Sequence, residues 1–204
     1  MNRRINKFLR MGMLLILAIG ITACGSPEGS AEPAEGETEA PIVVDDRGVP
    51  TLVFPVPEGF VIAEGIDGNE VYYTESYPED TSNMVVKVYD HDAYGVNWDE
   101  ETFQSSYEAG YEEAGTPVSN FTYIRFEKGM LENEYETLLI DYTIEFNSDV
   151  YRQIEHIVQL DTRTYVQTYT QLGTQDTDHM NAFLTSIARE SVTYDGENSD
   201  EVNK

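Results

Sequence analysis

The sequence predicts an α+β fold in which an antiparallel sheet, ending in a long C-terminal meander, is covered by two amphipathic helices. The 204-residue chain contains fourteen Tyr and eight Phe, which together with many Val, Ile and Thr favour strands. Several segments of the C-terminal half alternate apolar and polar residues, as half-buried strands do. Two other segments repeat large apolar residues every three or four positions, which is typical of an amphipathic helix.

Four short strands are expected ahead of the first helix, at 51–54, 60–64, 70–75 and 83–89. Asp67-Gly68 joins the second and third of them as a typical hairpin turn. The helix is expected to begin at Asn97 or Asp99, since either side chain can cap its first turn. Gly115 marks its end. Its apolar side consists of Phe103, Tyr107 and Tyr111.

The meander follows as four longer strands, at 118–127, 134–146, 151–160 and 163–171. We expect its turns at Lys128-Gly129, Asn147-Ser148-Asp149 and Asp161-Thr162. A helix at about 175–189 and a short closing strand at 191–194 complete the fold. Each helix has one narrow apolar stripe, so each needs a face of the sheet to cover. One buried face of the second meander strand consists of Leu138, Ile140, Tyr142, Ile144 and Phe146.

Residues 1–23 have the layout of an export signal peptide. Four basic residues and no acidic residue precede an apolar run that ends at Ala23. This run is shorter than the ~20 residues of a membrane-spanning helix, although an uncleaved anchor is the alternative. Ile21-Thr22-Ala23-Cys24 resembles the lipobox of bacterial lipoprotein precursors. The resemblance implies cleavage after Ala23 and attachment of fatty acids such as palmitate to Cys24 through a diglyceride.

Composition divides the remaining chain into an acidic disordered tether at 24–50, a single α+β domain at 51–194 and a polar tail at 195–204. Loss of residues 1–23 would leave eight basic residues against 38 acidic ones, a formal charge of −30. That charge repels nucleic acid and anionic lipid headgroups. We therefore expect no nucleic-acid partner and a covalent lipid attachment to the extracytoplasmic face of the cell membrane. An unidentified protein or the cell wall is the expected partner.

The order of the expected elements resembles the PsbP-like fold. The points of likeness are the Pro57-Glu58-Gly59-Phe60 turn, the helix led by Asp99-Glu100-Glu101-Thr102-Phe103, the long meander, and the last helix ending in Phe183-Leu184-Thr185-Ser186-Ile187. The resemblance covers about 51–194. It implies an α/β/α sandwich with a non-enzymatic binding or assembly role, and it assigns no functional residue.

No catalytic motif emerges from the sequence. It lacks a G-x-S-x-G elbow, and its three histidines lack the spacing of metal ligands. We expect His156 to pack within or beside the core, and His91 and His179 to be solvated. Close carboxylate pairs are expected by chance among 38 acidic residues. An envelope hydrolase that uses dispersed carboxylates is therefore the alternative to an accessory role.

One acidic stretch partly matches a calcium loop. Asp90, Asp92, Gly95 and Glu101 occupy its first, third, sixth and twelfth positions. Carboxylate oxygens, a sharp glycine turn and a terminal glutamate suit Ca²⁺, but Tyr94 stands where an oxygen ligand is usual. The alternative is a solvated loop whose acids favour the N-terminus of the following helix.

A second pattern lies in the last meander strand, where alternate residues are aromatic or amide side chains. Such groups could stack on and hydrogen-bond a sugar or peptide. Core packing beneath a helix is the alternative, because tyrosine is common in strands. The residues are Tyr165, Gln167, Tyr169 and Gln171.

Overall fold

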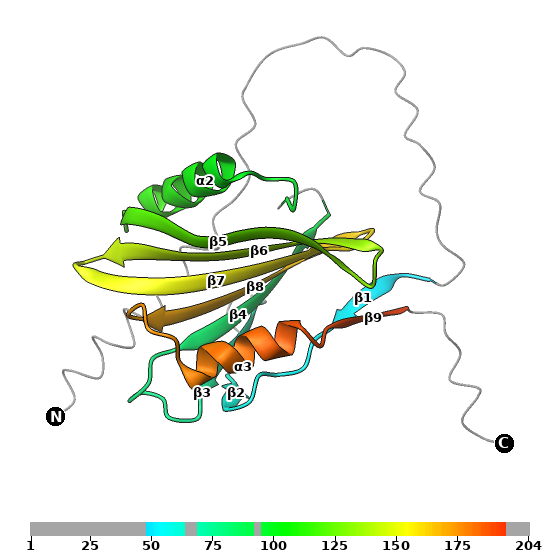
Figure 1. Cartoon of the computed structure of the whole chain (residues 1–204), viewed down its shortest axis with the longest axis horizontal. Coiled ribbons are helices and arrows are strands. Elements are labelled where there is room, and N and C mark those ends of the chain that lie inside the picture. Colours follow the sequence, from blue (N-terminus) through cyan, green and yellow to red (C-terminus); the bar gives the residue numbers. More distant parts are fainter. Residues whose placement is uncertain (1–47, 64–68, 92–94, 195–204) are drawn as a thin grey trace, which may run out of the picture.

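The computed structural model describes residues 48–63, 69–91 and 95–194 (Figure 1). The expected signal peptide, Cys24, the tether up to residue 47, the Asp67-Gly68 turn, Asp92 and the tail lie outside the described residues. In chain order the elements are β1 (Pro50–Val53), β2 (Phe60–Ile62), β3 (Glu70–Thr74), β4 (Asn83–Asp90), α2 (Glu100–Glu113), β5 (Ser119–Leu131), β6 (Tyr135–Phe146), β7 (Asp149–Gln159), β8 (Arg163–Leu172), α3 (Asp178–Ile187) and β9 (Ser191–Tyr194).

Seven strands form one antiparallel sheet in the order β2-β3-β4-β8-β7-β6-β5. The run from β5 to β8 is the predicted meander, in which each strand pairs with the next along the chain. β4 joins the other side of β8, so the N-terminal strands extend the same sheet. β1 and β9 form a separate antiparallel pair, which brings the two ends of the domain together.

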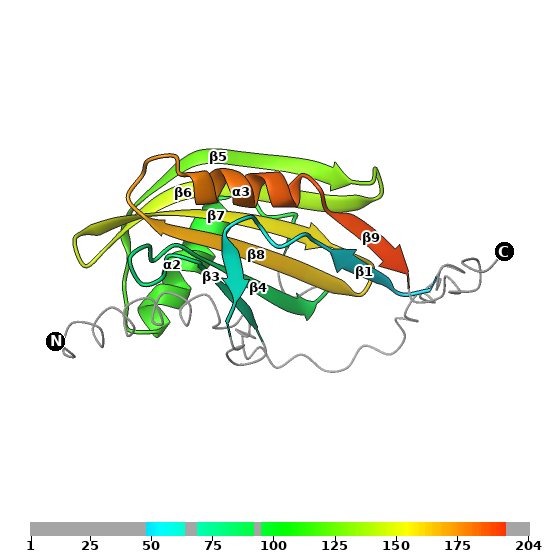
Figure 2. The same ribbon diagram turned by 90° about the horizontal axis from the view of Figure 1, so that it is seen from below.

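The sheet lies between two helical layers (Figures 1 and 2). α2 packs on one face, where Phe103, Tyr107 and Tyr111 join the alternating apolar residues of β6 in one core cluster. α3 covers the opposite face, where Met180 and Phe183 are buried. We call these the α2 face and the α3 face. The predicted α+β class and its α/β/α layering are confirmed.

The two helices begin where a side chain caps them. The Asp99 carboxylate accepts a hydrogen bond from the Thr102 backbone N–H at 2.8 Å, as predicted. Thr177 caps α3, so α3 is shorter than the predicted 175–189. Gln175 and Asp176 stay in the preceding loop because both contact other parts of the chain. Within the described residues, neither helix is long and apolar enough to cross a membrane.

The predicted turn at Lys128-Gly129 is wrong. β5 continues to Leu131, and the chain reverses at Glu132 and Asn133, whose φ angles are 52° and 58°. Gly129 instead lies opposite Thr137, where an added Cβ would come within 2.9 Å of Thr137 Oγ1. The glycine thus permits a close approach between β5 and β6. The residues next to Gly129 in the sequence do not predict this contact.

Candidate functional site

A band of polar side chains crosses the α2 face of the sheet. The register aligns Tyr142, Gln153, Thr170 and Asn83 in one row from β6 to β4. Other members lie two or four residues along the same strands and therefore share this face. All are buried. We call the following seven residues the polar band: Asn83, Lys87, Tyr142, Gln153, Glu155, Thr168 and Thr170.

A chain of hydrogen bonds connects α2 to the polar band. The Tyr111 and Tyr107 hydroxyl oxygens are 2.9 Å apart, and Tyr107 donates to Gln153 Oε1. The Tyr142 hydroxyl oxygen lies 3.1 Å from Gln153 Oε1 and 3.0 Å from Glu155 Oε1. A hydroxyl has one proton, and a carboxylate is the stronger acceptor. Tyr142 therefore donates to Glu155, which forms the negative end of the chain.

These tyrosines act as hydrogen-bond donors because they hold their protons. Burial, and next the negative charge of Glu155, raise the pKa of Tyr142 well above its usual value. Burial is also the main cause that raises the pKa of Tyr107, with smaller effects from Tyr111 and Glu155. At the edge of the band, burial and Glu155 raise the pKa of Tyr89 to about 12. The tyrosines stay neutral around a buried carboxylate.

Lys87 is the cationic member of the polar band. Burial lowers its pKa to about 8, and the charge of Glu155 only partly opposes that effect. Lys87 lies between apolar neighbours in Val86-Lys87-Val88, and Glu155 between Ile154 and His156. Sequence reasoning missed both as site residues. For Lys87 the available signal was a lysine inside the otherwise largely apolar run Met84–Tyr89 of β4, whereas β7 contains several other polar residues that hide Glu155.

Raising the pH from 8 to 10 is expected to stabilise the wild-type chain by about 2 kcal/mol more than the Lys87→Met variant. Over this range folded Lys87 releases its proton, while in the unfolded chain it titrates near its ordinary value of 10.5. The unfolded state then binds more protons, so the free energy of unfolding rises with pH. Urea unfolding of both chains across this range measures the difference, and parallel pH profiles would contradict a desolvated Lys87.

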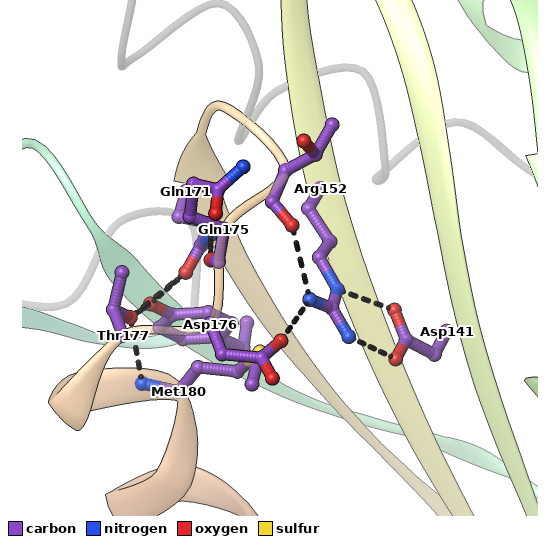
Figure 3. A network of polar contacts seen from close by, with 9 residues as sticks. Asp141, Arg152, Gln171, Gln175, Asp176, Thr177 and Met180 are labelled. Atoms are coloured by element: carbon purple, nitrogen blue, oxygen red, sulfur yellow. Dashed lines mark hydrogen bonds and ion pairs between the residues drawn. The ribbon is translucent and has the colours of Figure 1, made fainter. Parts of the chain in front are cut away.

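On the α3 face, Arg152 anchors a second polar network (Figure 3). Its Nε and Nη2 lie 2.8 and 2.7 Å from the two oxygens of Asp141. Its Nη1 lies 2.6 Å from Asp176 Oδ1 and donates to the Thr174 carbonyl oxygen at 3.2 Å. These partners raise the pKa of Arg152. The guanidinium therefore links the sheet to the loop that precedes α3.

The same network positions the start of α3. Gln171 Nε2 donates to the Gln175 carbonyl oxygen at 2.6 Å, and the Thr177 hydroxyl donates to Gln171 Oε1 at 2.9 Å. Thr177 Oγ1 in turn accepts from the Met180 backbone N–H at 3.1 Å. Figure 3 shows these groups side by side. Their arrangement is that of a structural clamp on the helix.

The histidines have separate environments. His156 is buried, as predicted, and its Nδ1 lies 3.2 Å from Glu190 Oε2. The partly exposed His179 ring has Nδ1 2.7 Å from Asp80 Oδ2. His91 lies at the end of β4, with its Nε2 2.9 Å from Gln159 Nε2. Among the described residues, no three His, Cys, Asp or Glu side chains are grouped to hold a metal ion.

The residues of the calcium prediction are only partly described. Asp90 is exposed at the end of β4, opposite Arg163 of β8. Glu101 is exposed in the first turn of α2, where it helps to line an open groove of about 460 Å³ between α2 and Tyr123. Because Asp92 lies outside the described residues, calcium binding stays a prediction.

The aromatic and amide row of β8 is buried on the α3 face. Tyr169 stacks on Phe183 of α3 with ring centroids 5.6 Å apart. Tyr165 belongs to the cluster that includes Leu52 of β1. Gln167 donates to Glu190, and Gln171 belongs to the clamp described above. The row is packed as core, so it presents no surface for stacking a sugar.

Comparisons with known proteins identify fold relatives. LpqN, involved in cell envelope biogenesis of Mycobacterium tuberculosis, matches 72% of this chain and 85% of its own length at 14% identity, with a TM-score of 0.50. PsbP of Synechocystis sp. PCC 6803 matches 82% and 99% at 11% identity and TM-score 0.49. A Bacteroides thetaiotaomicron protein matches 74% and 50% at 11% identity and TM-score 0.46. No protein-family model and no curated protein sequence matches. The LpqN match shows a shared fold.

Proposed function

We propose that this chain is a lipid-anchored protein of the bacterial cell envelope, with a domain that acts as a non-enzymatic binding or assembly accessory on the extracytoplasmic face. The position of the sole cysteine carries the proposal. Cys24 directly follows Ile21-Thr22-Ala23, after a basic start and a short apolar run. Such a segment directs export, and a cysteine at this point is the attachment site of a diglyceride in lipoprotein precursors.

The charge of the chain favours a covalent lipid over electrostatic attachment. After cleavage the chain would carry eight basic residues against 38 acidic ones, and this excess repels anionic headgroups. One acyl chain binds a membrane only marginally, whereas two bind it stably. Burial of the acyl chains in the bilayer would therefore hold the protein at a membrane whose anionic headgroups repel it.

The partners and positions of the buried carboxylates favour an accessory role over that of a hydrolase. Asp141 pairs with Arg152, and Glu190 accepts from Gln167, both on the α3 face. Glu155 lies on the α2 face, so the sheet separates it from the other two. A glycosidase needs two carboxylates on either side of one substrate bond. The fold shared with LpqN, a protein involved in cell envelope biogenesis, agrees with an envelope role.

Replacing Cys24 with Ala is expected to abolish both fatty acylation and cleavage after Ala23. Without the thiol no diglyceride can attach, and hydrocarbon burial no longer fixes the chain to the membrane. Mass spectrometry of the N-terminal peptide from a bacterial host measures both changes. Ser26→Ala is the matched control and is expected to be acylated and cleaved normally. A wild-type chain with an unmodified Cys24 thiol would contradict the proposal.

A further inference from the structure

Exposed apolar side chains are concentrated at the start of the domain, in residues 48–63, which we call the N-terminal apolar segment. Only Glu58 is charged in this segment, although 25% of the residues of the whole chain are charged. Large apolar side chains that are 40–63% exposed recur along it, and five of the ten exposed ones in the described residues belong to it. These five are Val49, Val53, Val56, Val61 and Ile62.

The N-terminal apolar segment is fixed to the rest of the domain by side chains that point inward. Leu52 of β1 is buried in the cluster that includes residues of β7 and β8. The ring of Phe54 meets Tyr72 edge-on at 6.4 Å, and that of Phe60 meets Tyr169 at 6.2 Å. The exposure of the alternate apolar side chains is therefore a property of a packed segment.

Three of the exposed side chains lie on one side of the domain. β1 and the connection 54–59 are on the same side of the sheet as α3 (Figures 1 and 2). Val53 and Val56 flank Phe54, which contacts the Tyr72 ring. Ile62 of β2 lies directly opposite Tyr72 in the sheet and shares its face. We call Val53, Val56 and Ile62 the apolar patch.

The apolar patch follows the expected lipid attachment site closely in the chain. Residues 24–47 connect Cys24 to the N-terminal apolar segment. Even fully extended, at about 3.3–3.6 Å per residue, they would span no more than roughly 85 Å. A lipid at Cys24 would therefore keep the patch at an effective concentration of roughly millimolar relative to the bilayer. At such a concentration a weak contact is enough for docking.

We propose that the apolar patch docks on the lipid bilayer that holds Cys24, so that the α3 side of the domain faces the membrane. This inference rests on the proposed lipid anchor. Burial of apolar side chains in the interfacial region is favourable. The chain as a whole is acidic, but repulsion by its other surfaces is screened beyond ~8 Å at physiological salt. The segment with a single charge is thus the part best suited to approach headgroups.

A second copy of the chain fits the apolar patch less well than a bilayer does. Two chains with a formal charge of −26 each repel one another. A stable protein interface uses about 20–30 residues on each side, many more than the three of the patch. Docking on the bilayer would also direct α2, on the opposite face of the sheet, away from the membrane and towards a partner.

The test uses the full chain, acylated in a bacterial host and reconstituted in phosphatidylcholine liposomes. Since Cys24 is the sole cysteine and carries the lipid, Val56→Cys introduces the only free thiol, which takes an environment-sensitive fluorophore. Its emission is expected to shift to the blue and to be quenched by lipids with a spin label in their acyl chains. Ser106→Cys, at an exposed position of α2, is the matched control and is expected to show neither change.

A charge within the apolar patch is expected to undo the docking. Ile62→Asp in the labelled Val56→Cys chain should weaken the docking equilibrium ~10-fold, because it replaces a buried apolar side chain by a charge. Ile124→Asp is the matched control, since Ile124 is 51% exposed on β5, and it should leave the quenching unchanged. Val53→Asp is the second patch variant and decides the assignment if Ile62→Asp does not fold.

Three results would overturn the inference: equal quenching at positions 56 and 106, unchanged quenching in the Asp variants of the patch, or a blue shift that grows with the protein-to-lipid ratio. The last result would indicate a second copy as the occupant. Mass spectrometry of Cys24 separates this inference from the anchor. An acylated chain without quenching at position 56 would contradict the docked patch alone, whereas an unmodified Cys24 would contradict the anchor itself.

Discussion

Replacing Arg152 with Met is expected to lower the free energy of unfolding by about 3–5 kcal/mol. The change leaves Asp141, which is 0% exposed, as a buried carboxylate without its cation. It also removes the contacts to Thr174 and Asp176 that hold the loop before α3. Urea unfolding followed by circular dichroism measures the loss.

Two control variants separate the buried charge from other effects. The double variant Asp141→Leu/Arg152→Met is expected to regain most of the stability, because both charges are then removed together. Arg125→Met breaks a more exposed pair with Glu127, at 3.9 Å, and is expected to cost less than about 1 kcal/mol. Equal losses for Arg152→Met and Arg125→Met would show that the Arg152 network contributes no special stability.

Replacing Phe103 with Ala is expected to lower the free energy of unfolding by about 3–5 kcal/mol through the cavity it leaves. Phe103 is fully buried where α2 meets the sheet. Its ring stacks on Tyr107 at 5.7 Å and meets Tyr142 edge-on at 5.5 Å. Hydrogen exchange is expected to show that amides of α2 lose more protection than those of α3.

Gln104→Ala is the matched control on the same helix. Gln104 is only partly buried, and its amide donates to Glu108 at 2.8 Å, so its loss is expected to change stability by less than about 0.5 kcal/mol. If Phe103→Ala destabilised α2 and α3 equally, the α2 layer would not be an independent unit of local stability.

The elements that the sequence predicted well depend on local periodicity. Alternation along β6 identified its buried face from Leu138 to Phe146, because successive side chains of a strand point to opposite faces. The capping side chain of Asp99 and the four-residue spacing of Phe103, Tyr107 and Tyr111 predicted the position of α2, because residues that far apart share one side of a helix. Both predictions therefore use only residues that are a few positions apart in the chain.

The errors concern residues whose role is set by a distant partner. Gly129 was expected in a turn, yet it lies within β5, close to the side chain of Thr137 on the neighbouring strand. α3 was expected to include Gln175 and Asp176, but contacts to Gln171 and Arg152 keep both in the loop. The pairing of β9 with β1 likewise joins segments more than a hundred residues apart.

By itself the sequence determined the fold class, the order of the elements and the expectation of a lipid at Cys24, since each is encoded in contiguous residues. Only the tertiary structure decided that Lys87, Glu155 and Asn83 lie on one face. Lys87 and Asn83 come from β4 and Glu155 from β7, two strands that are distant from each other in the chain but lie on either side of β8 in the sheet. The physical reason is that strand pairing sets which side chains meet, and the register of that pairing is a property of the assembled sheet.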